Sequence, residues 1–139
     1  MEHRSDHTGG DTGRDTIVHR FRARVAEQPA RSALRYHEGG SWRSLSWREY
    51  GAAVDEVAAG LMALGVAPGD RVAVLAANCP EWKIVDLAVL SAGAISVPIY
   101  PTSSSSQVAY VLMQSGSRLC FVEDAEQLAK VLLHLEELP

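Results

Sequence analysis

The segment from Arg71 to Ala77 constrains the fold most, because almost every residue in it is apolar. Valine recurs at alternate positions in its first half, which favours an extended strand. A strand that is apolar on both sides must be covered on both faces, as in parallel α/β sheets. The sequence therefore predicts a sheet with helices on its two faces.

Helical and strand-like segments alternate after this strand. Pro80–Ala92 is predicted as a helix capped by Asn78 or Cys79, and its apolar side chains surround most of the helix. Pro98 indicates an edge or interrupted strand. The remaining predicted elements are strands at Ala94–Tyr100 and Arg118–Val122, a helix closed by Gly116, and a helix at Asp124–Leu138 with Leu128, Val131, Leu132 and Leu135 on one face. This alternation predicts an α/β, mostly parallel β/α layered subdomain.

The N-terminal half predicts a leading helix, a small β-hairpin and a long helix. The leading helix has Ile17, Val18, Phe21 and Val25 on its apolar side and stops before Pro29. The hairpin joins Ala33–His37 to Trp42–Leu45 across two glycines. The long helix opens with a capping box at Ser46 and Glu49 and ends at a left-handed Gly65. Its predicted buried stripe is Tyr50, Val54, Val57, Leu61 and Leu64.

Residues 1–15 are polar and predict a disordered leader, and 16–139 predict one domain. The leader has no apolar core of a signal peptide, and no apolar run is long enough to span a bilayer, so a cytoplasmic location is predicted without a transmembrane segment. The formal net charge of -4 gives no overall basic field for nucleic acid or an anionic membrane. Arg20, Arg22 and Arg24 are expected on the wet face of the first helix.

Recognisable chemical motifs are missing from the sequence. The turn Ala76–Pro80 has no glycine, which argues against a dinucleotide site, and there is no Walker loop, GxSxG elbow or histidine pair at metal spacing. Cys79 and Cys120 do not form a CxxC site, and Cys120 is predicted to be a buried, inert thiol. Thr8–Arg14 resembles a phosphate loop in composition only, and Ser103–Ser106 favours a helix cap over an anion site. We therefore assign no catalytic, cofactor-binding or metal-ligating residue.

Five sequence blocks are notable when they are taken together in order. They are Ser46–Tyr50 with Gly60–Val74, Asn78–Trp82, Ala92–Ala94, Val97–Thr102, and Tyr110–Leu112 with Ser115–Gly116. This ordered set resembles the early region of the adenylate-forming (AMP-forming acyl-CoA) synthetases. The segment Pro98–Ser104 is most similar to that of the long-chain fatty acid–CoA ligases.

The resemblance implies a two-step reaction, in which fatty acid and ATP give an acyl-adenylate and coenzyme A then takes the acyl group. ATP, Mg²⁺ and coenzyme A are thus implied for the full-length family enzyme, whose catalytic residues lie downstream of this region. We expect 16–139 to be the N-terminal part of an AMP-binding domain, truncated at its C-terminus and inactive alone. Its expected partner is the missing downstream part, which would also cover part of Pro80–Ala92 and of the Leu128 stripe.

Two alternatives stay open. The chain could derive from a fatty acyl-AMP ligase or another acid–thiol ligase of the same superfamily. It could also be a freestanding, non-catalytic interaction domain. The sequence following Pro139 would separate the enzyme hypotheses from the interaction domain.

Overall fold

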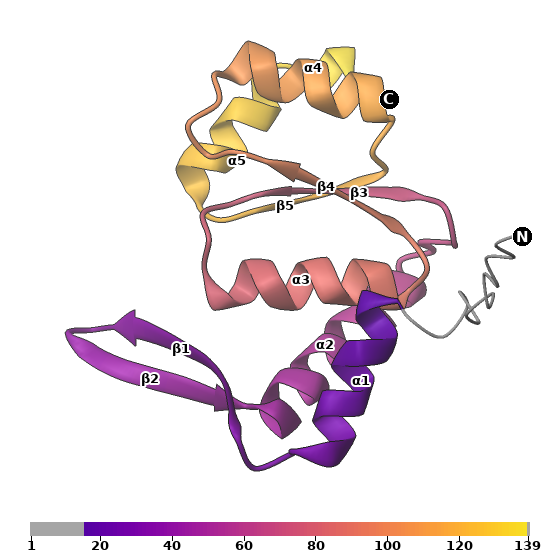
Figure 1. Cartoon of the computed structure of the whole chain (residues 1–139). Coiled ribbons are helices and arrows are strands. Elements are labelled where there is room, and N and C mark those ends of the chain that lie inside the picture. Colours follow the sequence, from indigo (N-terminus) through magenta and orange to yellow (C-terminus); the bar gives the residue numbers. More distant parts are fainter. Residues whose placement is uncertain (1–15, 139) are drawn as a thin grey trace, which may run out of the picture.

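The computed structural model describes residues 16–138 and contains a three-stranded parallel sheet with helices on both faces (Figure 1). The strands are β3 (Arg71–Leu75), β4 (Ile95–Ile99) and β5 (Leu119–Val122), in the order β4-β3-β5. Helix α3 (Pro80–Ser91) covers one face, and α4 (Ser105–Ser115) and α5 (Ala125–Leu132) cover the other. The predicted α/β class is confirmed, and β4 is an edge strand as Pro98 indicated. The predicted leader, 1–15, lies outside the described residues.

The central strand β3 supplies both hydrophobic cores. Val72 packs into a core with residues of α2 and α3, whereas Ala73 and Leu75 pack into a second core with residues of α4. This alternation follows from the two-residue period of a strand. Residues 72–75 are all buried, so the strand is covered on both faces as its composition predicted.

A second helical layer packs against α3. Helices α1 (Ile17–Glu27) and α2 (Trp47–Ala63) lie on the side of α3 that faces away from the sheet (Figure 1). Every residue of α3 after Glu81 is consequently buried or half-buried. Helices α1 and α2 thus provide cover for α3 within the described residues, and the expected partial cover from chain beyond Pro139 stays a prediction.

The long helix α2 begins and ends as predicted. The backbone N–H of Glu49 donates to Ser46 Oγ at 3.3 Å, and the backbone N–H of Ser46 donates to Glu49 Oε2 at 2.8 Å. Gly65 has φ +81° and donates to Met62 O, while the next N–H, of Val66, donates to Leu61 O. This pair of bonds is the Schellman motif.

One residue of the predicted buried stripe of α2 is exposed. Leu64 is 71% exposed because it is the last residue before the chain leaves α2 at Gly65. Tyr50, Val54 and Leu61 are buried as predicted, and Gly51 and Ala58 are buried as well. On the apolar side of α1, Ile17 is exposed at the first turn and Phe21 is buried.

The last helix is shorter than the predicted span Asp124–Leu138. Asp124 caps it, but α5 ends at Leu132 because His134 leaves the helical region at φ −122°, and a single 3₁₀ turn, η1 (Leu135–Glu137), follows. Leu128, Leu132 and Leu135 are exposed, and Val131 packs against the core beneath α4.

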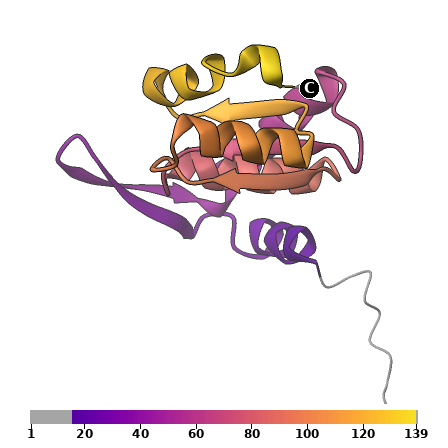
Figure 2. The same cartoon turned by 90° about the horizontal axis from the view of Figure 1, so that it is seen from above.

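The hairpin of β1 (Ser32–Glu38) and β2 (Ser41–Ser46) projects from the body (Figures 1 and 2). Gly39 and Gly40 make the turn, both at positive φ, which a tight two-residue hairpin turn requires. At its base, Ala33 and Leu34 pack against the hydrophobic core of the body, and Leu45 is half-buried.

Alanine substitutions at Gly65 and Gly60 are expected to have opposite effects on the free energy of unfolding. Gly65→Ala places a side chain at φ +81° with nothing within 4 Å, so we expect only backbone strain, of about 1 kcal/mol. Gly60→Ala lies inside the helix, also with open space, and should stabilise by about 0.5–1 kcal/mol through helix propensity. Urea unfolding of both variants measures the difference. Equal effects would mean that α2 does not end at Gly65.

Gly51 lies where α1 and α2 pack closely together. A Cβ at this position would lie 2.8 Å from Val25 Cγ1 and 3.0 Å from Cγ2. We expect Gly51→Ala to destabilise by about 1–3 kcal/mol through overpacking. In a Val25→Ala background the same change should cost at least about 1 kcal/mol less. A double-mutant cycle by urea unfolding checks this, and strict additivity would contradict the contact.

Candidate functional site

Two clefts meet at the first turn of α3, where Trp82 and Lys83 line both. The larger, of 690 Å³, is lined by Ala76, Ala77, Asn78, Trp82, Lys83, Pro98, Ile99, Tyr100, Pro101 and Thr102. The smaller, of 380 Å³, is a groove between α1, α2 and α3. Neither was predicted from the sequence, because each combines residues that are far apart along the chain.

The larger cleft lies at the carboxyl ends of β3 and β4. The helix after β3 packs on one face of the sheet and the helix after β4 on the other (Figure 1), so the two connections diverge here. Such a switch point is where open α/β sheets bind ligands. The lining is mainly apolar and aromatic, with Asn78, Lys83 and Thr102 as its polar side chains. The cleft can therefore accommodate an apolar group.

The same edge is unsuited to a phosphate group. Glu123 Oε2 accepts a hydrogen bond from the backbone N–H of Ala77 at 2.7 Å, which places a carboxylate beside the turn after β3. At the start of α3, Cys79 Sγ accepts from the N–H of Trp82 at 3.4 Å, and Glu81 adds a negative charge in the first turn. The backbone N–H groups that could bind an anion here already donate to Glu123 and Cys79. The carboxylates of Glu123 and Glu81 would also repel an anion.

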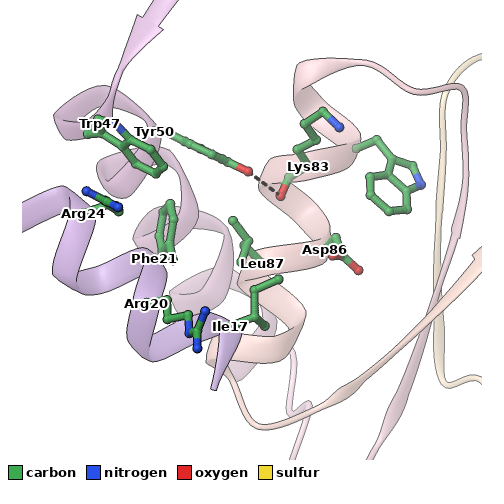
Figure 3. Close-up of a pocket in the computed structure, with 10 residues that line it drawn as sticks. Ile17, Arg20, Phe21, Arg24, Trp47, Tyr50, Lys83, Asp86 and Leu87 are labelled. Carbon is green, nitrogen blue, oxygen red and sulfur yellow. Dashed lines mark hydrogen bonds between the residues drawn. The ribbon is translucent and has the colours of Figure 1, made fainter. Parts of the chain in front are cut away.

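An aromatic cluster forms the floor of the smaller groove (Figure 3). The rings of Phe21 and Tyr50 meet edge to face at 5.0 Å between centroids, and Trp47 lies 6.1 Å and 6.3 Å from them. Figure 3 shows the Tyr50 side chain reaching from α2 to α3, where its hydroxyl donates to the carbonyl of Lys83 at 3.2 Å. Burial raises the pKa of Tyr50 to about 12, aided by Asp86. Tyr50 therefore remains a neutral donor that ties the two helices together.

The serine run is a helix cap. Ser104 Oγ accepts from the N–H of Gln107, and Gln107 Oε1 accepts from the N–H of Ser104 at 2.9 Å. This capping box confirms the predicted interpretation of Ser103–Ser106. The other phosphate-like segment, Thr8–Arg14, lies outside the described residues.

Neither cysteine is activated. Both are free and half-buried, and burial raises the pKa of Cys79 and raises that of Cys120 to about 11. The Cys120 thiol is less deeply buried than predicted, but its raised pKa agrees with an inert group.

Within 16–138, no group of three or more His, Cys, Asp or Glu side chains is placed to hold a metal ion. Over the same residues, no helix combines the length and apolarity needed to cross a bilayer.

Comparison with known proteins decides the family. Residues 21–138 match the family described as AMP-binding enzyme. The chain belongs to the AMP-binding enzyme family. Two long-chain-fatty-acid–CoA ligases are among its relatives: heimdall of Drosophila melanogaster is 39% identical over 98 residues, and FadD15 of Mycobacterium bovis is 43% identical over 84 residues.

The alignments cover 70% and 60% of this chain but only 14% of each ligase. The crystal structure of the anthranilate CoA ligase AuaEII superposes with a TM-score of 0.81 at 23% identity, over 88% of this chain and 23% of that protein. That likeness establishes the fold.

Two of the sequence blocks that resemble the family line the larger cleft. Asn78 and Trp82 follow β3, and Tyr100–Thr102 follow β4, so the second and fourth blocks meet at one sheet edge. Because parallel strands bring their carboxyl ends together, the positions after the two predicted strands were the signal that could have indicated this cleft.

The reactivity of the Cys120 thiol tests whether burial raises its pKa. In a Cys79→Ala variant, Cys120 with a pKa of about 11 should be alkylated by iodoacetamide about a hundredfold more slowly than the urea-unfolded chain at pH 7.5. The rate should rise about tenfold per pH unit between pH 8 and 10, because only the thiolate reacts. Mass spectrometry of the labelled chain follows both rates. Equal rates for folded and unfolded chain would contradict the raised pKa.

Proposed function

We propose that this chain forms the N-terminal scaffold of a long-chain fatty acid–CoA ligase, and that it does not activate a fatty acid without the rest of an AMP-binding domain. The complete reaction would convert fatty acid, ATP and coenzyme A into acyl-CoA, AMP and diphosphate. The family match over 21–138 and the names of the ligase relatives support this proposal.

The observation that carries the inactivity proposal is the negative carboxyl edge of β3. Glu123 occupies the N–H of Ala77, and the turn Ala76–Pro80 has no glycine that would let a backbone approach phosphates. The part of the chain that the structure describes also holds no group of three or more His, Cys, Asp or Glu side chains placed to bind a metal ion. The phosphates of ATP therefore do not fit the turn after β3, and we derive no catalytic step from these residues.

A scaffold role agrees with where the matching residues lie. Gly65 and Gly93 end helices at positive φ, and Asp70 Oδ2 accepts from the N–H of Ala67 in the turn before β3. That hydrogen bond lowers the pKa of Asp70, and Arg118 lowers it further by donating to the same oxygen at 2.8 Å. These contacts hold the connections of the sheet. The cytoplasmic location predicted from the sequence stays a prediction.

Calorimetry with Mg-ATP tests the proposal directly. We expect no binding tighter than about 1 mM, which corresponds to about −4 kcal/mol. The complete ligase with its own ATP site is the positive control in the same buffer. Saturable binding of ATP to this chain in the micromolar range would contradict the proposal.

Complementation tests the ligase assignment. This chain is co-expressed with a FadD15-type ligase that lacks the matching N-terminal region, and diphosphate release is measured with palmitate, ATP and coenzyme A. Activity that needs both parts would support the scaffold role. Activity of this chain alone, or activity only with an aromatic acid, would contradict the inactive scaffold or the fatty acid substrate respectively.

A further inference from the structure

Charge is distributed unevenly over the described residues. Residues 16–50, which form α1, the hairpin and the start of α2, contain seven arginines and three glutamates, a formal net charge of +4. Residues 51–138 contain ten carboxylates and four basic side chains, a formal net charge of −6. The whole-chain value of -4 hides this asymmetry, so its use in excluding an anionic surface was too coarse.

Part of the negative charge lies across the sheet from α1 and the hairpin. Figure 1 shows α1 and the hairpin below α3, and α5 and η1 above the sheet. The upper side holds Glu123, Asp124, Glu126, Glu136 and Glu137, half of the ten carboxylates. On the lower side, Asp55 of α2 pairs with Arg22 at 2.6 Å, and Glu56 of α2 and Glu81 and Asp86 of α3 add three more carboxylates. The sheet and α3, each about 10 Å thick, separate the hairpin from the upper carboxylates by more than the roughly 8 Å screening length at physiological ionic strength. A surface that meets the hairpin is therefore shielded from the upper carboxylates.

The hairpin carries an aromatic and cationic cluster at its far end. His37 and Trp42 are directly paired across the strands and their rings meet edge to face at 5.7 Å. The guanidinium of Arg35 lies 5.4 Å from the Trp42 ring centroid. All three are exposed, and Trp42 is 67% exposed. These residues share one face, because positions two apart along a strand point the same way.

The other face of the hairpin adds a further arginine. Arg43 lies opposite Tyr36, and its pairing with Glu38, the single carboxylate of the hairpin, is long at 3.7 Å and exposed on both sides. Such a surface pair holds its arginine weakly. Arg31 and Arg48 are exposed where the hairpin joins the body.

We propose that the hairpin docks this protein peripherally on an anionic lipid bilayer, with Trp42 in the headgroup region and Arg35 and Arg43 on lipid phosphates. Tryptophan suits that region because it has an apolar body and a polar N–H. Arginine binds phosphate through its planar fork of donors. A strand of seven residues is about 23 Å long, so the projecting end reaches a flat surface without the body touching it.

A flat bilayer explains this arrangement better than a nucleic acid does. A strand of nucleic acid would need a continuous basic track and several stacking rings, whereas the hairpin offers one exposed tryptophan and a few separated arginines. Residues 51–138, with a formal net charge of −6, would repel a long polyanion that extended beyond the hairpin. This inference does not depend on which acid the proposed ligase uses.

Vesicle sedimentation tests the docking. The full chain is mixed with vesicles of phosphatidylcholine alone or with one third phosphatidylglycerol, at 0.05 M and 0.5 M NaCl. We expect binding to the anionic vesicles at low salt and its loss at high salt, because the arginines act through screened charges. Equal binding to both lipids, no binding to either, or preference for single-stranded RNA over the vesicles would overturn the proposal.

Matched variants locate the contact. Trp42→Ala and Arg35→Gln should each weaken binding to the anionic vesicles about fivefold or more. Tyr110→Ala and Arg118→Gln remove an exposed aromatic ring and an exposed arginine outside the hairpin, and should change binding less than twofold. Thermal melts establish that all four variants are folded. If the control variants weaken binding as much as the hairpin variants, the hairpin is not the docking element.

Discussion

The rest of the structure depends on one strand that is buried on both faces. Because β3 lies between β4 and β5 and its alternate side chains enter different cores, neither face can be left to water. The helices must then lie on opposite faces, and the short β/α connections bring them there. Arg71, at the start of β3, holds the far end of α4 in place, since its Nε donates to Ser115 O at 2.7 Å and its Nη2 donates to Gly116 O at 3.0 Å.

The buried strand also explains the second layer. Helix α3 covers the sheet with one side, and its opposite side is apolar too, so α1 and α2 pack there around the Phe21, Trp47 and Tyr50 rings. The edge-to-face geometry and the Tyr50 hydrogen bond give this contact a defined orientation. The hairpin connects α1 to α2. Within the described residues only its base packs against the body, so its charged and aromatic end is exposed to solvent.

The candidate site was only partly predictable. The sequence correctly indicated that the serine run is a cap, because a cap depends on neighbouring residues. It did not indicate the cleft shared by Trp82, Lys83 and Tyr100, nor the Glu123 carboxylate on the N–H of Ala77, because 46 positions separate that pair. Side-chain contacts across a sheet edge follow from strand order, which local pattern does not specify.

Local chemistry in the sequence determined the elements and their ends. Each of these ends depends on contacts within a few residues, so the local sequence is enough to predict it. Examples are the Ser46 capping box, the left-handed Gly65 and the Gly39–Gly40 turn. Tertiary structure alone decided which apolar residues are covered: α3 is enclosed by α1 and α2, while Leu64 and Leu132 remain exposed. Periodicity shows that a side is apolar, but burial also requires a neighbour at the right distance, and that neighbour is set by how the layers stack. The separation of the hairpin from the carboxylates of α5 and η1 has the same origin, since it arises only when the hairpin and α5 lie on different sides of the sheet.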